Sequence, residues 1–315
     1  MSTKIFGLGI ALAAAAVALL AVATVWVVWR PTVAPSASIV RHAGEAEAPH
    51  GDYNQQRWWV PVRSPGQGAG EELLLEAVVY RPSGPGPFPL VVIDHGKPTL
   101  HGNASDFQPR FEAAAHWFVE HGFAVTVLAR RGYGRSQGTV SDMVGSCSDM
   151  DYYATARQTA RDAEGVIAFM RQQHFVDPAR IVAVGHSHGG LGVLGLATIA
   201  PPGLVGAISF AGGSGAWGSR GKFCNGRDHL VAAVRKLGAE TKLPELWLYA
   251  LNDDTFDPAV AAEMQQAFNS AASSPAVLVT LPAATSNGHM LFPGGNAGLW
   301  GPHVQQFLDR ILKAQ

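Results

Sequence analysis

Short, continuously hydrophobic runs alternate through most of the chain with longer segments that have helical length. Continuous apolarity is typical of strands that are covered on both faces. Strands and helices alternating at this spacing predict a mostly parallel sheet with helices wound on both sides. The predicted strands are residues 90–94, 124–129, 181–185, 205–210, 246–251 and 276–281, and the predicted helices are residues 111–121, 154–173, 191–199, 229–237, 258–271 and 300–313.

A different pattern precedes the first of these strands. Residues 57–62 and 72–80 flank the turn-rich segment SPGQGAG, which is typical of an antiparallel hairpin. We therefore expect one α/β domain over residues 53–315, with an antiparallel hairpin at its leading edge. A chain of 315 residues can bury about 75% of its unfolded surface in a single core, so no second domain is required.

The amino-terminal residues have the composition of a membrane segment. Residues 5–29 are uncharged and predominantly apolar, and a helix of about 20 such residues spans a bilayer. Residues 1–30 are predicted to be an uncleaved, single-pass signal anchor in the cell membrane, with the catalytic domain outside the cytoplasm. The alternative is a signal peptide cleaved after the small residues 21–23, which gives a periplasmic or secreted protein. Residues 31–52, rich in Ala, Pro and Glu, are predicted to be a tether.

The composition excludes several classes of protein. The chain has 23 Lys+Arg and 24 Asp+Glu, a formal net charge of -1, and only 15% charged residues against a usual ~25%. This balance argues against electrostatic binding of nucleic acid, so no nucleic-acid partner is expected. Two cysteines in so long a chain exclude a disulfide-stapled mini-protein and a four-cysteine metal module.

One motif predicts a specific local structure, a tight turn that exposes a serine. Residues 180–190 read RIVAVGHSHGG, an apolar strand followed by Gly-x-Ser-x-Gly and a helix of small apolar residues. Ser187 is predicted to lie on a tight strand-to-helix turn, where the flanking glycines avoid collisions with neighbouring backbone. The amino terminus of the helix favours the negative oxygen that forms when a serine attacks a carbonyl. The alternative is a glycine-rich turn with an incidental serine.

A serine nucleophile needs a histidine base and a carboxylate that orients the histidine, and in this architecture they follow in the order Ser, Asp, His. The strand at 246–251 leads into the sequence NDDTFD. Asp253 is the predicted acid, with Asp254 as the closest alternative because a shift of one residue cannot be fixed from sequence. Asp257 is predicted to cap the helix that begins at Pro258.

Two histidines follow the predicted acid, His289 and His303. His289 lies in the polar segment TSNGH just after the last predicted strand, which is where the base is expected. His303 lies at the start of the last predicted helix, where a solvated surface side chain is the simpler interpretation. We therefore predict a catalytic group of Ser187, Asp253 and His289.

The same chemistry needs two backbone N–H groups that bind the oxyanion. The residue after the nucleophile, His188, supplies one, and the HGK sequence after strand 90–94 makes Lys97 the predicted second donor, with a solvated ammonium group. His186 and His188 could instead bind a metal. Two imidazoles two residues apart on a tight turn, without a third ligand nearby, make a poor metal site. No metal and no cofactor are expected.

Together, five segments resemble the α/β-hydrolase superfamily, and within it the dienelactone hydrolase-related and prolyl oligopeptidase-related serine hydrolases. They are HGK at 95–97, ARRGYGRSQG at 129–138, GHSHGG at 185–190, LYALNDDTFDP at 248–258 and SNGHMLF at 286–292. The resemblance covers roughly residues 55–315 and implies the α/β-hydrolase fold. Dienelactone hydrolases have cysteine at the position matched by Ser187, so their lactone substrate does not carry over.

The resemblance also implies an arginine–glycine turn at residues 131–136, near the mouth of the site. Arg131 and Arg135 either bind an acidic group of the substrate or pair with nearby carboxylates, and pairing is the expectation. Residues 211–228 form the longest candidate lid, which is short and glycine-rich, so an open site without a large lid is predicted. Trp217 and Phe223 are interpreted either as apolar walls of the site or as loop anchors.

Cys147 and Cys224 fall in two loops that are both predicted at the carboxyl edge of the sheet. In an oxidising compartment they could form a disulfide. The alternative, two unpaired cysteines that pack as small hydrophobic residues, is equally compatible with the sequence.

Three functions fit these residues. The leading hypothesis is a serine hydrolase that cleaves small or medium carboxylic esters through an acyl-enzyme and is tethered to, or exported across, the membrane. The second is a serine peptidase acting on short peptides. The large amino-terminal propeller of prolyl oligopeptidases is not found in this sequence, which weighs against this second hypothesis. The third is a catalytically silent binding module, although such modules usually lack a member of the catalytic group. The sequence does not specify the natural substrate or the oligomeric state.

Overall fold

The computed structural model describes residues 42–63, 72–98, 103–109, 111–216 and 222–313. These residues lie within one compact unit, Arg41–Gln315. The predicted membrane anchor at residues 1–30 lies outside the described residues. Of the predicted tether, only residues 42–52 are described.

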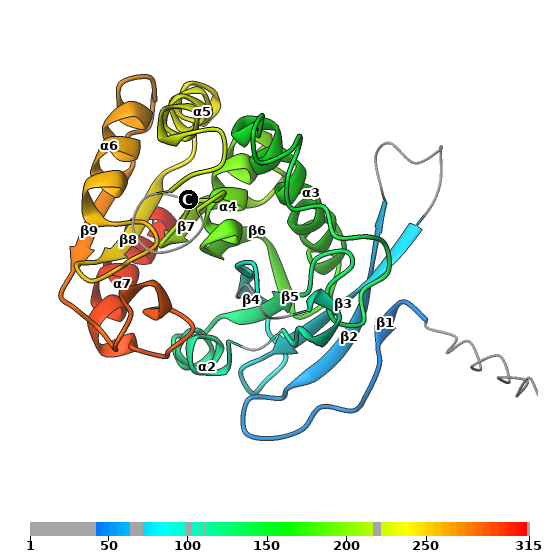
Figure 1. Cartoon of the computed structure of the whole chain (residues 1–315). Coiled ribbons are helices and arrows are strands. Elements are labelled where there is room, and N and C mark those ends of the chain that lie inside the picture. Colours follow the sequence, from blue (N-terminus) through cyan, green and yellow to red (C-terminus); the bar gives the residue numbers. More distant parts are fainter. Residues whose placement is uncertain (1–41, 64–71, 99–102, 110, 217–221, 314–315) are drawn as a thin grey trace, which may run out of the picture. The chain divides into compact units, whose positions relative to one another are not determined.

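A nine-stranded sheet forms the centre of this unit, in the order β1-β2-β3-β5-β4-β6-β7-β8-β9 (Figure 1). From β5 onward in this order, neighbouring strands are parallel, whereas β1, β2, β3 and β5 pair in antiparallel fashion. The strands are β1 (Gly44–Glu45), β2 (Gln56–Arg63), β3 (Glu72–Tyr80), β4 (Phe88–Asp94), β5 (Ala124–Leu128), β6 (Val176–His186), β7 (Leu204–Phe210), β8 (Glu245–Ala250) and β9 (Val277–Leu281). The predicted parallel sheet with a leading antiparallel hairpin is confirmed.

The hairpin of β2 and β3 pairs Gln56 with Val79 at one end and Arg63 with Glu72 at the other. Strand β1 is a feature that the sequence pattern did not predict. It lies in the segment interpreted as a tether and pairs with β2, and Glu47 just beyond it forms an ion pair with Arg57 at 3.4 Å. A two-residue strand has no hydrophobic alternation, so only its partner reveals it.

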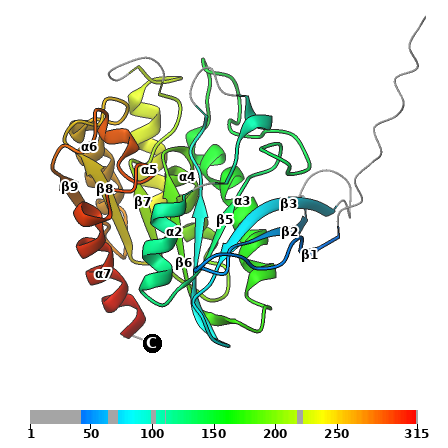
Figure 2. The same ribbon diagram turned by 90° about the horizontal axis from the view of Figure 1, so that it is seen from below.

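Helices cover both faces of the sheet (Figures 1 and 2). One hydrophobic core lies between the sheet and α3, α4, α5 and α6, and a second lies between the opposite face and α2 and α7. The helices are α2 (Glu112–Glu120), α3 (Tyr152–Met170), α4 (His188–Ile199), α5 (Arg227–Glu240), α6 (Pro258–Asn269) and α7 (Ala297–Lys313), with short 3-10 turns η1 (Ala104–Asp106) and η2 (Gly288–Met290). Each predicted helix is present, with ends shifted by a few residues.

Helix α4 is the most buried of these helices, and small residues let it approach its neighbours closely. A Cβ atom on Gly195 would lie 2.4 Å from the Ala156 carbonyl oxygen of α3, and one on Gly192 would lie 2.6 Å from Thr159. The small-residue pattern of the sequence HGGLGVLGLATI therefore sets the distance between α3 and α4. This packing fixes where α4 begins, which is the end that faces the candidate site.

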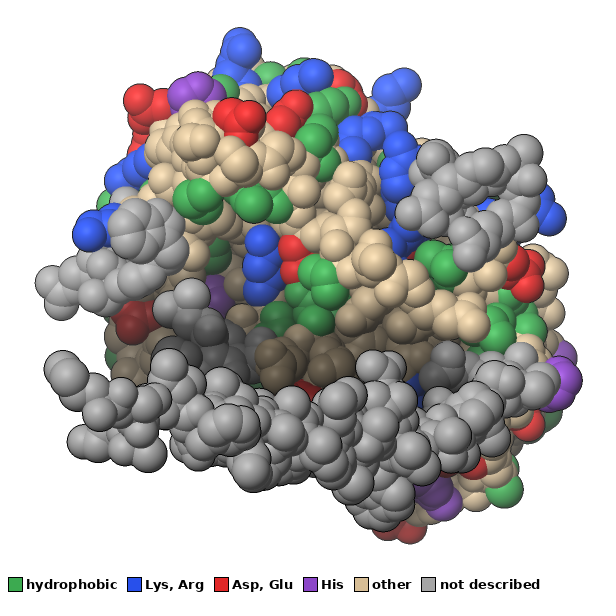
Figure 3. All heavy atoms as spheres, turned by 45° about the vertical axis from the view of Figure 1, so that its right-hand side comes forward, with side chains coloured by type: hydrophobic (Ala, Val, Ile, Leu, Met, Phe, Trp, Pro, Cys, Tyr) green, Lys and Arg blue, Asp and Glu red, His purple; other side chains and the backbone are tan. Residues whose placement is uncertain are grey.

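Acidic, basic and hydrophobic side chains occur together on the face of the molecule drawn in Figure 3. This mixture agrees with the formal net charge of -1. Within the described ranges, none of the helices combines the length and the apolar character needed to span a membrane.

Glu245, the first residue of β8, carries a fully buried carboxyl group. The Trp247 indole N–H donates to its Oε2 at 2.9 Å. Burial removes the carboxylate from water and raises the pKa of Glu245 to about 8. The group is therefore protonated in the folded protein at neutral pH and ionised in the unfolded chain.

We predict that Glu245→Gln removes one component of the pH dependence of stability. Between pH 4.5, the ordinary pKa of the group, and about 8, folded Glu245 holds a proton that the unfolded chain has released, so stability falls as pH rises. This component is about 1.4 kcal/mol per pH unit. In urea unfolding at pH 5.5 and 7.5, the variant should gain stability relative to the wild type at the higher pH. The prediction would be contradicted if the free energies of unfolding of the two proteins changed equally with pH, or if the exposed control Glu112→Gln gained as much stability at the higher pH.

Candidate active site

Ser187 lies where β6 ends and α4 begins. Its backbone has φ 54° and ψ −117°, a conformation that serine rarely adopts. Two backbone hydrogen bonds hold it there: its N–H donates to the Phe210 carbonyl at 2.9 Å, and its carbonyl accepts from the Gly213 N–H at 3.0 Å. The predicted strand–turn–helix is present, and Ser187 is partly exposed at the carboxyl edge of the sheet.

The glycines around Ser187 are required by close backbone approach. A Cβ atom on Gly185 would lie 2.1 Å from the Gly189 carbonyl oxygen, and one on Gly189 would lie 2.4 Å from the Asp94 carbonyl oxygen. These distances confirm the steric reason predicted for the glycines. A Cβ on Gly96 would lie 3.0 Å from the Ser187 Cβ, so the turn after β4 lies directly against the serine.

Asp253 follows β8 and is buried. Its Oδ1 accepts the backbone N–H groups of Thr255 and Phe256, both at 2.9 Å. Its Oδ2 lies 3.2 Å from the His289 Nδ1. The carboxylate is thus fixed by two backbone donors and presents its remaining oxygen to the imidazole.

The neighbouring acids occupy different surroundings. Asp254 is exposed, and its Oδ1 accepts only the Thr255 hydroxyl, at 3.3 Å, among the recorded contacts of the described residues. Asp257 accepts the N–H groups of Ala259 and Val260 at 2.9 Å, which confirms the predicted helix cap. Of the two alternatives that the sequence left open, the structure brings Asp253 to His289.

His289 lies in η2 and is partly buried, with 13% of its side chain exposed. Because its Nδ1 faces the Asp253 carboxylate, Nδ1 carries the proton and Nε2 keeps the lone pair that a base needs. His186 contacts the same segment, since its Nε2–H donates to the His289 carbonyl at 2.8 Å. Burial, together with the nearby His289, lowers the pKa of His186 to about 3, so this ring is neutral.

No hydrogen bond joins the Ser187 hydroxyl to the His289 ring among the described residues. His186, which precedes Ser187 in the chain, has its ring centroid 5.0 Å from that of His289. Catalytic hydrogen bonds are often long in unliganded proteins and shorten when substrate binds. His303 lies in α7 and lines a pocket with Leu246 and Val277, near the starts of β8 and β9, and the structure does not bring it to Asp253.

The two predicted oxyanion donors flank Ser187. His188 is the first residue of α4, and the N–H groups of the first helical turn have no partner within the helix. Lys97 follows Gly96 in the turn that lies against the serine, and Lys97 is exposed. Both segments therefore lie directly beside Ser187.

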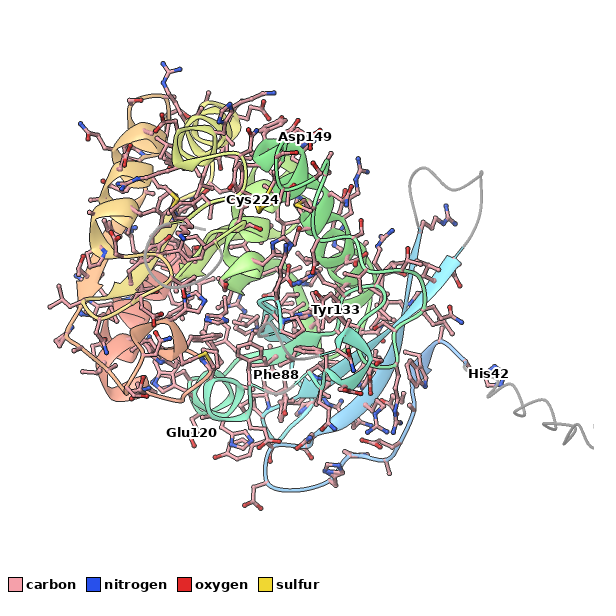
Figure 4. The ribbon with its side chains drawn as sticks, viewed as in Figure 1. His42, Phe88, Glu120, Tyr133, Asp149 and Cys224 are labelled. Atoms are coloured by element: carbon pink, nitrogen blue, oxygen red, sulfur yellow. A yellow bond between two sulfur atoms is a disulfide. The ribbon has the colours of Figure 1, made fainter. Side chains whose placement is uncertain are left out.

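A buried charge cluster lies beneath this turn, around Arg130. The Arg130 guanidinium donates to the Asp94 carboxylate at 2.5 Å and lies 3.4 Å from the Asp142 Oδ1. Tyr133, labelled in Figure 4, donates its hydroxyl to Asp142. Burial raises the pKa of Asp94 to about 6, although Arg130 lowers it in part.

Arg130 and Asp94 were not among the predicted site residues, yet the sequence carries a signal for them. Asp94 ends β4, and Arg130 follows β5, its parallel neighbour. The carboxyl ends of parallel neighbours meet at one edge of the sheet, so an acid and a base at these two positions should be expected to pair. The neighbouring Arg131 donates from its Nε to Asp162 of α3 at 2.9 Å, which agrees with the expectation that Arg131 pairs with a nearby carboxylate.

Cys147 and Cys224 form a disulfide, which decides between the two possibilities that the sequence left open. The bond links the loop before α3 to the loop after β7, and the Asn225 N–H donates to the Cys147 carbonyl at 2.6 Å beside it. Cys224 is labelled in Figure 4. Both cysteines lie at the carboxyl edge of the sheet, as expected.

Of the candidate lid at residues 211–228, the structure describes 211–216 and 222–228, and these residues contain no helix before α5 begins at Arg227. Phe223 is buried, with its ring centroid 5.9 Å from that of Phe256, and is therefore a loop anchor. Trp217 lies outside the described residues. Among the described residues, no cluster of three or more His, Cys, Asp or Glu side chains could hold a metal ion.

Comparisons with known proteins identify both a sequence family and a fold. A family model described as X-Pro dipeptidyl-peptidase (S15 family) matches residues 70–272. No curated protein matches the sequence. A Klebsiella pneumoniae protein described as a dienelactone hydrolase is similar in structure, with a TM-score of 0.53, 16% identity, and coverage of 80% of this chain and 97% of that one.

Two further structures have the same architecture. The esterase Pf2001 of Pyrococcus furiosus matches with a TM-score of 0.55 and 11% identity, over 82% of this chain and 93% of the esterase. Dipeptidyl peptidase 4 of Porphyromonas gingivalis matches with a TM-score of 0.55 and 16% identity, over 83% of this chain but only 36% of the peptidase. These similarities confirm the predicted fold.

Proposed function

Because the chain belongs to the X-Pro dipeptidyl-peptidase (S15) family and has the α/β-hydrolase fold, we propose that it is a serine hydrolase that cleaves carboxylic esters through an acyl-enzyme. One observation supports this most strongly. The buried Asp253 carboxylate lies 3.2 Å from the His289 Nδ1, at the edge of the sheet where Ser187 occupies its strained turn. A carboxylate, an imidazole and a serine arranged in this order supply nucleophilic catalysis.

In the proposed reaction, the Ser187 oxygen attacks the ester carbonyl while the His289 Nε2 takes the hydroxyl proton. Asp253 keeps the imidazole in the correct tautomer and stabilises its positive charge. The N–H groups of Lys97 and His188 bind the oxyanion. The alkoxide then leaves with the proton from His289, and a water molecule, activated by the same histidine, releases the acid.

Hydrolysis of short peptides with proline in the second position is the second candidate, and the description of the family model favours it. The same catalytic residues support both reactions, because each passes through an acyl-enzyme. Ester hydrolysis is supported by the similarity to the esterase Pf2001, since the match covers 93% of the length of that esterase. A catalytically silent binding module is the third candidate, and it predicts no covalent labelling of Ser187.

We also propose that the enzyme works outside the cytoplasm, held by an uncleaved anchor at residues 5–29. The apolar composition of this segment supports the anchor. The disulfide between Cys147 and Cys224 supports an oxidising compartment, because disulfides persist there and are rare in the cytosol. Mass spectrometry of the mature amino terminus distinguishes the anchor from a cleaved signal peptide.

Covalent labelling with a fluorophosphonate tests the proposed mechanism, and two chromogenic substrates test the bond that is cleaved. We expect labelling of the wild type, none of Ser187→Ala, and faster hydrolysis of p-nitrophenyl butyrate than of an X-Pro p-nitroanilide. Undiminished labelling of Ser187→Ala would remove this serine from the mechanism. Faster hydrolysis of the anilide would favour the peptidase, and an unlabelled wild type would favour the silent module.

Asp253→Asn and Asp254→Asn form a matched pair of neighbouring substitutions. We predict that Asp253→Asn lowers kcat by about 10⁴-fold, because an amide in this position favours the wrong histidine tautomer. Asp254→Asn should keep kcat within about threefold, because surface substitutions of this kind change little. Steady-state kinetics on the butyrate ester measure both variants, and a larger loss in Asp254→Asn would reverse the assignment.

A further inference from the structure

We propose that Arg130 is a positioning residue that holds the two oxyanion-donating segments of this site in register. The inference rests on the proposed function, since it concerns the same site. Arg130 is 2% exposed and follows β5, behind the turn that carries Lys97. Its guanidinium contacts both the turn after β4 and the loop that reaches His188.

The first set of contacts fixes the turn after β4. The Arg130 backbone N–H donates to the His95 Nε2 at 3.1 Å, and its guanidinium donates to the His95 carbonyl and, at 2.5 Å, to the Asp94 carboxylate. Because Nε2 of His95 accepts this bond, its Nδ1 carries the proton and donates to the Gly96 carbonyl at 2.6 Å. The backbone that leads to Lys97 is thereby held from two sides.

The second set of contacts reaches the start of α4. The other guanidinium nitrogen of Arg130 lies 3.4 Å from the Asp142 Oδ1, and the same oxygen lies 3.5 Å from the His188 Nε2. Arg130 and Asp142 both belong to the loop between β5 and α3, so the pair connects this loop with the turn after β4 on one side and with His188 of α4 on the other. The His188 ring therefore lies against the carboxylate that binds Arg130, and the backbone N–H of the same residue is one of the two proposed oxyanion donors.

Two hydroxyl groups complete the surroundings of the His188 ring. Thr159 donates its hydroxyl to the Thr155 carbonyl, so its oxygen accepts the Nε2–H of His188 at 2.9 Å. The Nδ1 of His188 then accepts the Ser214 hydroxyl at 2.8 Å. The buried ring is consequently neutral and held in one tautomer, and its orientation fixes the first turn of α4.

This arrangement bears on catalysis because an oxyanion hole works only when both donors point at the developing charge. Removing one donor typically lowers kcat by about 10²- to 10³-fold, so misplacing both by a fraction of an ångström has a measurable effect. A planar guanidinium can bind Asp94, the His95 carbonyl and Asp142 at once, whereas a lysine ammonium on a flexible stem cannot reproduce that fork. The substitution Arg130→Lys therefore keeps the positive charge but removes the simultaneous contacts of the guanidinium with Asp94, the His95 carbonyl and Asp142.

The experiment compares Arg130→Lys with Arg131→Lys, a neighbouring arginine that pairs with the buried Asp162. We expect Arg130→Lys to lower kcat for p-nitrophenyl butyrate by about 10- to 100-fold, with KM changed less than about threefold, because the donors act mainly in the transition state. The rate constant of fluorophosphonate labelling should fall in parallel, since the phosphonyl oxygen occupies the same hole. Arg131→Lys should keep each constant within about threefold.

The thermal unfolding of each variant is measured alongside, so that only folded protein is compared. If Arg130→Lys does not fold, Asp142→Asn gives the same test, because it leaves the Arg130–Asp94 pair intact; its expected loss in kcat is about tenfold. An unchanged kcat in the folded variant, an equal loss in Arg131→Lys, or a loss confined to KM would overturn the proposal. Failure of the proposed function would look different, since the wild type would then remain unlabelled at Ser187.

Discussion

The strained turn at Ser187 is the constraint on which the site depends. Serine adopts φ 54° there because the backbones of β6, α4 and the turn after β4 approach too closely for any side chain at Gly185 or Gly189. Backbone hydrogen bonds to Phe210 and from Gly213 hold this conformation, and α4 begins at the next residue. Helix α4 can also pack closely against α3, because small residues line the contact between these two helices.

The parallel sheet explains why residues so far apart in sequence meet. Strands β4, β6 and β8 end at one edge, so the segments that follow them carry Gly96, Ser187 and Asp253 to the same place. This much follows from the hydrophobic pattern, since the carboxyl ends of the strands were predictable to within a residue, although β6 begins five residues before the predicted start. The order Ser, Asp, His then restricts the base to two histidines.

Other features depend on contacts that a hydrophobic pattern does not encode. Asp253 and Asp254 are chemically identical in the sequence, and only the two backbone donors and the burial of Asp253 separate them. The pairing of Cys147 with Cys224 depends on how two loops fold against each other. Arg130 looked like any arginine in a basic segment, and its buried partners at Asp94 and Asp142 become apparent only when neighbouring strands are paired.

A crystal structure of the fluorophosphonate-treated protein tests whether Ser187, Asp253 and His289 act together, because it shows the three side chains around a tetrahedral adduct. We expect phosphorus bonded to the Ser187 oxygen, the His289 Nε2 within hydrogen-bonding reach of that oxygen, and the phosphonyl oxygen facing the Lys97 and His188 N–H groups. An adduct on another residue, or a His289 ring that stays out of reach of the Ser187 oxygen, would contradict it.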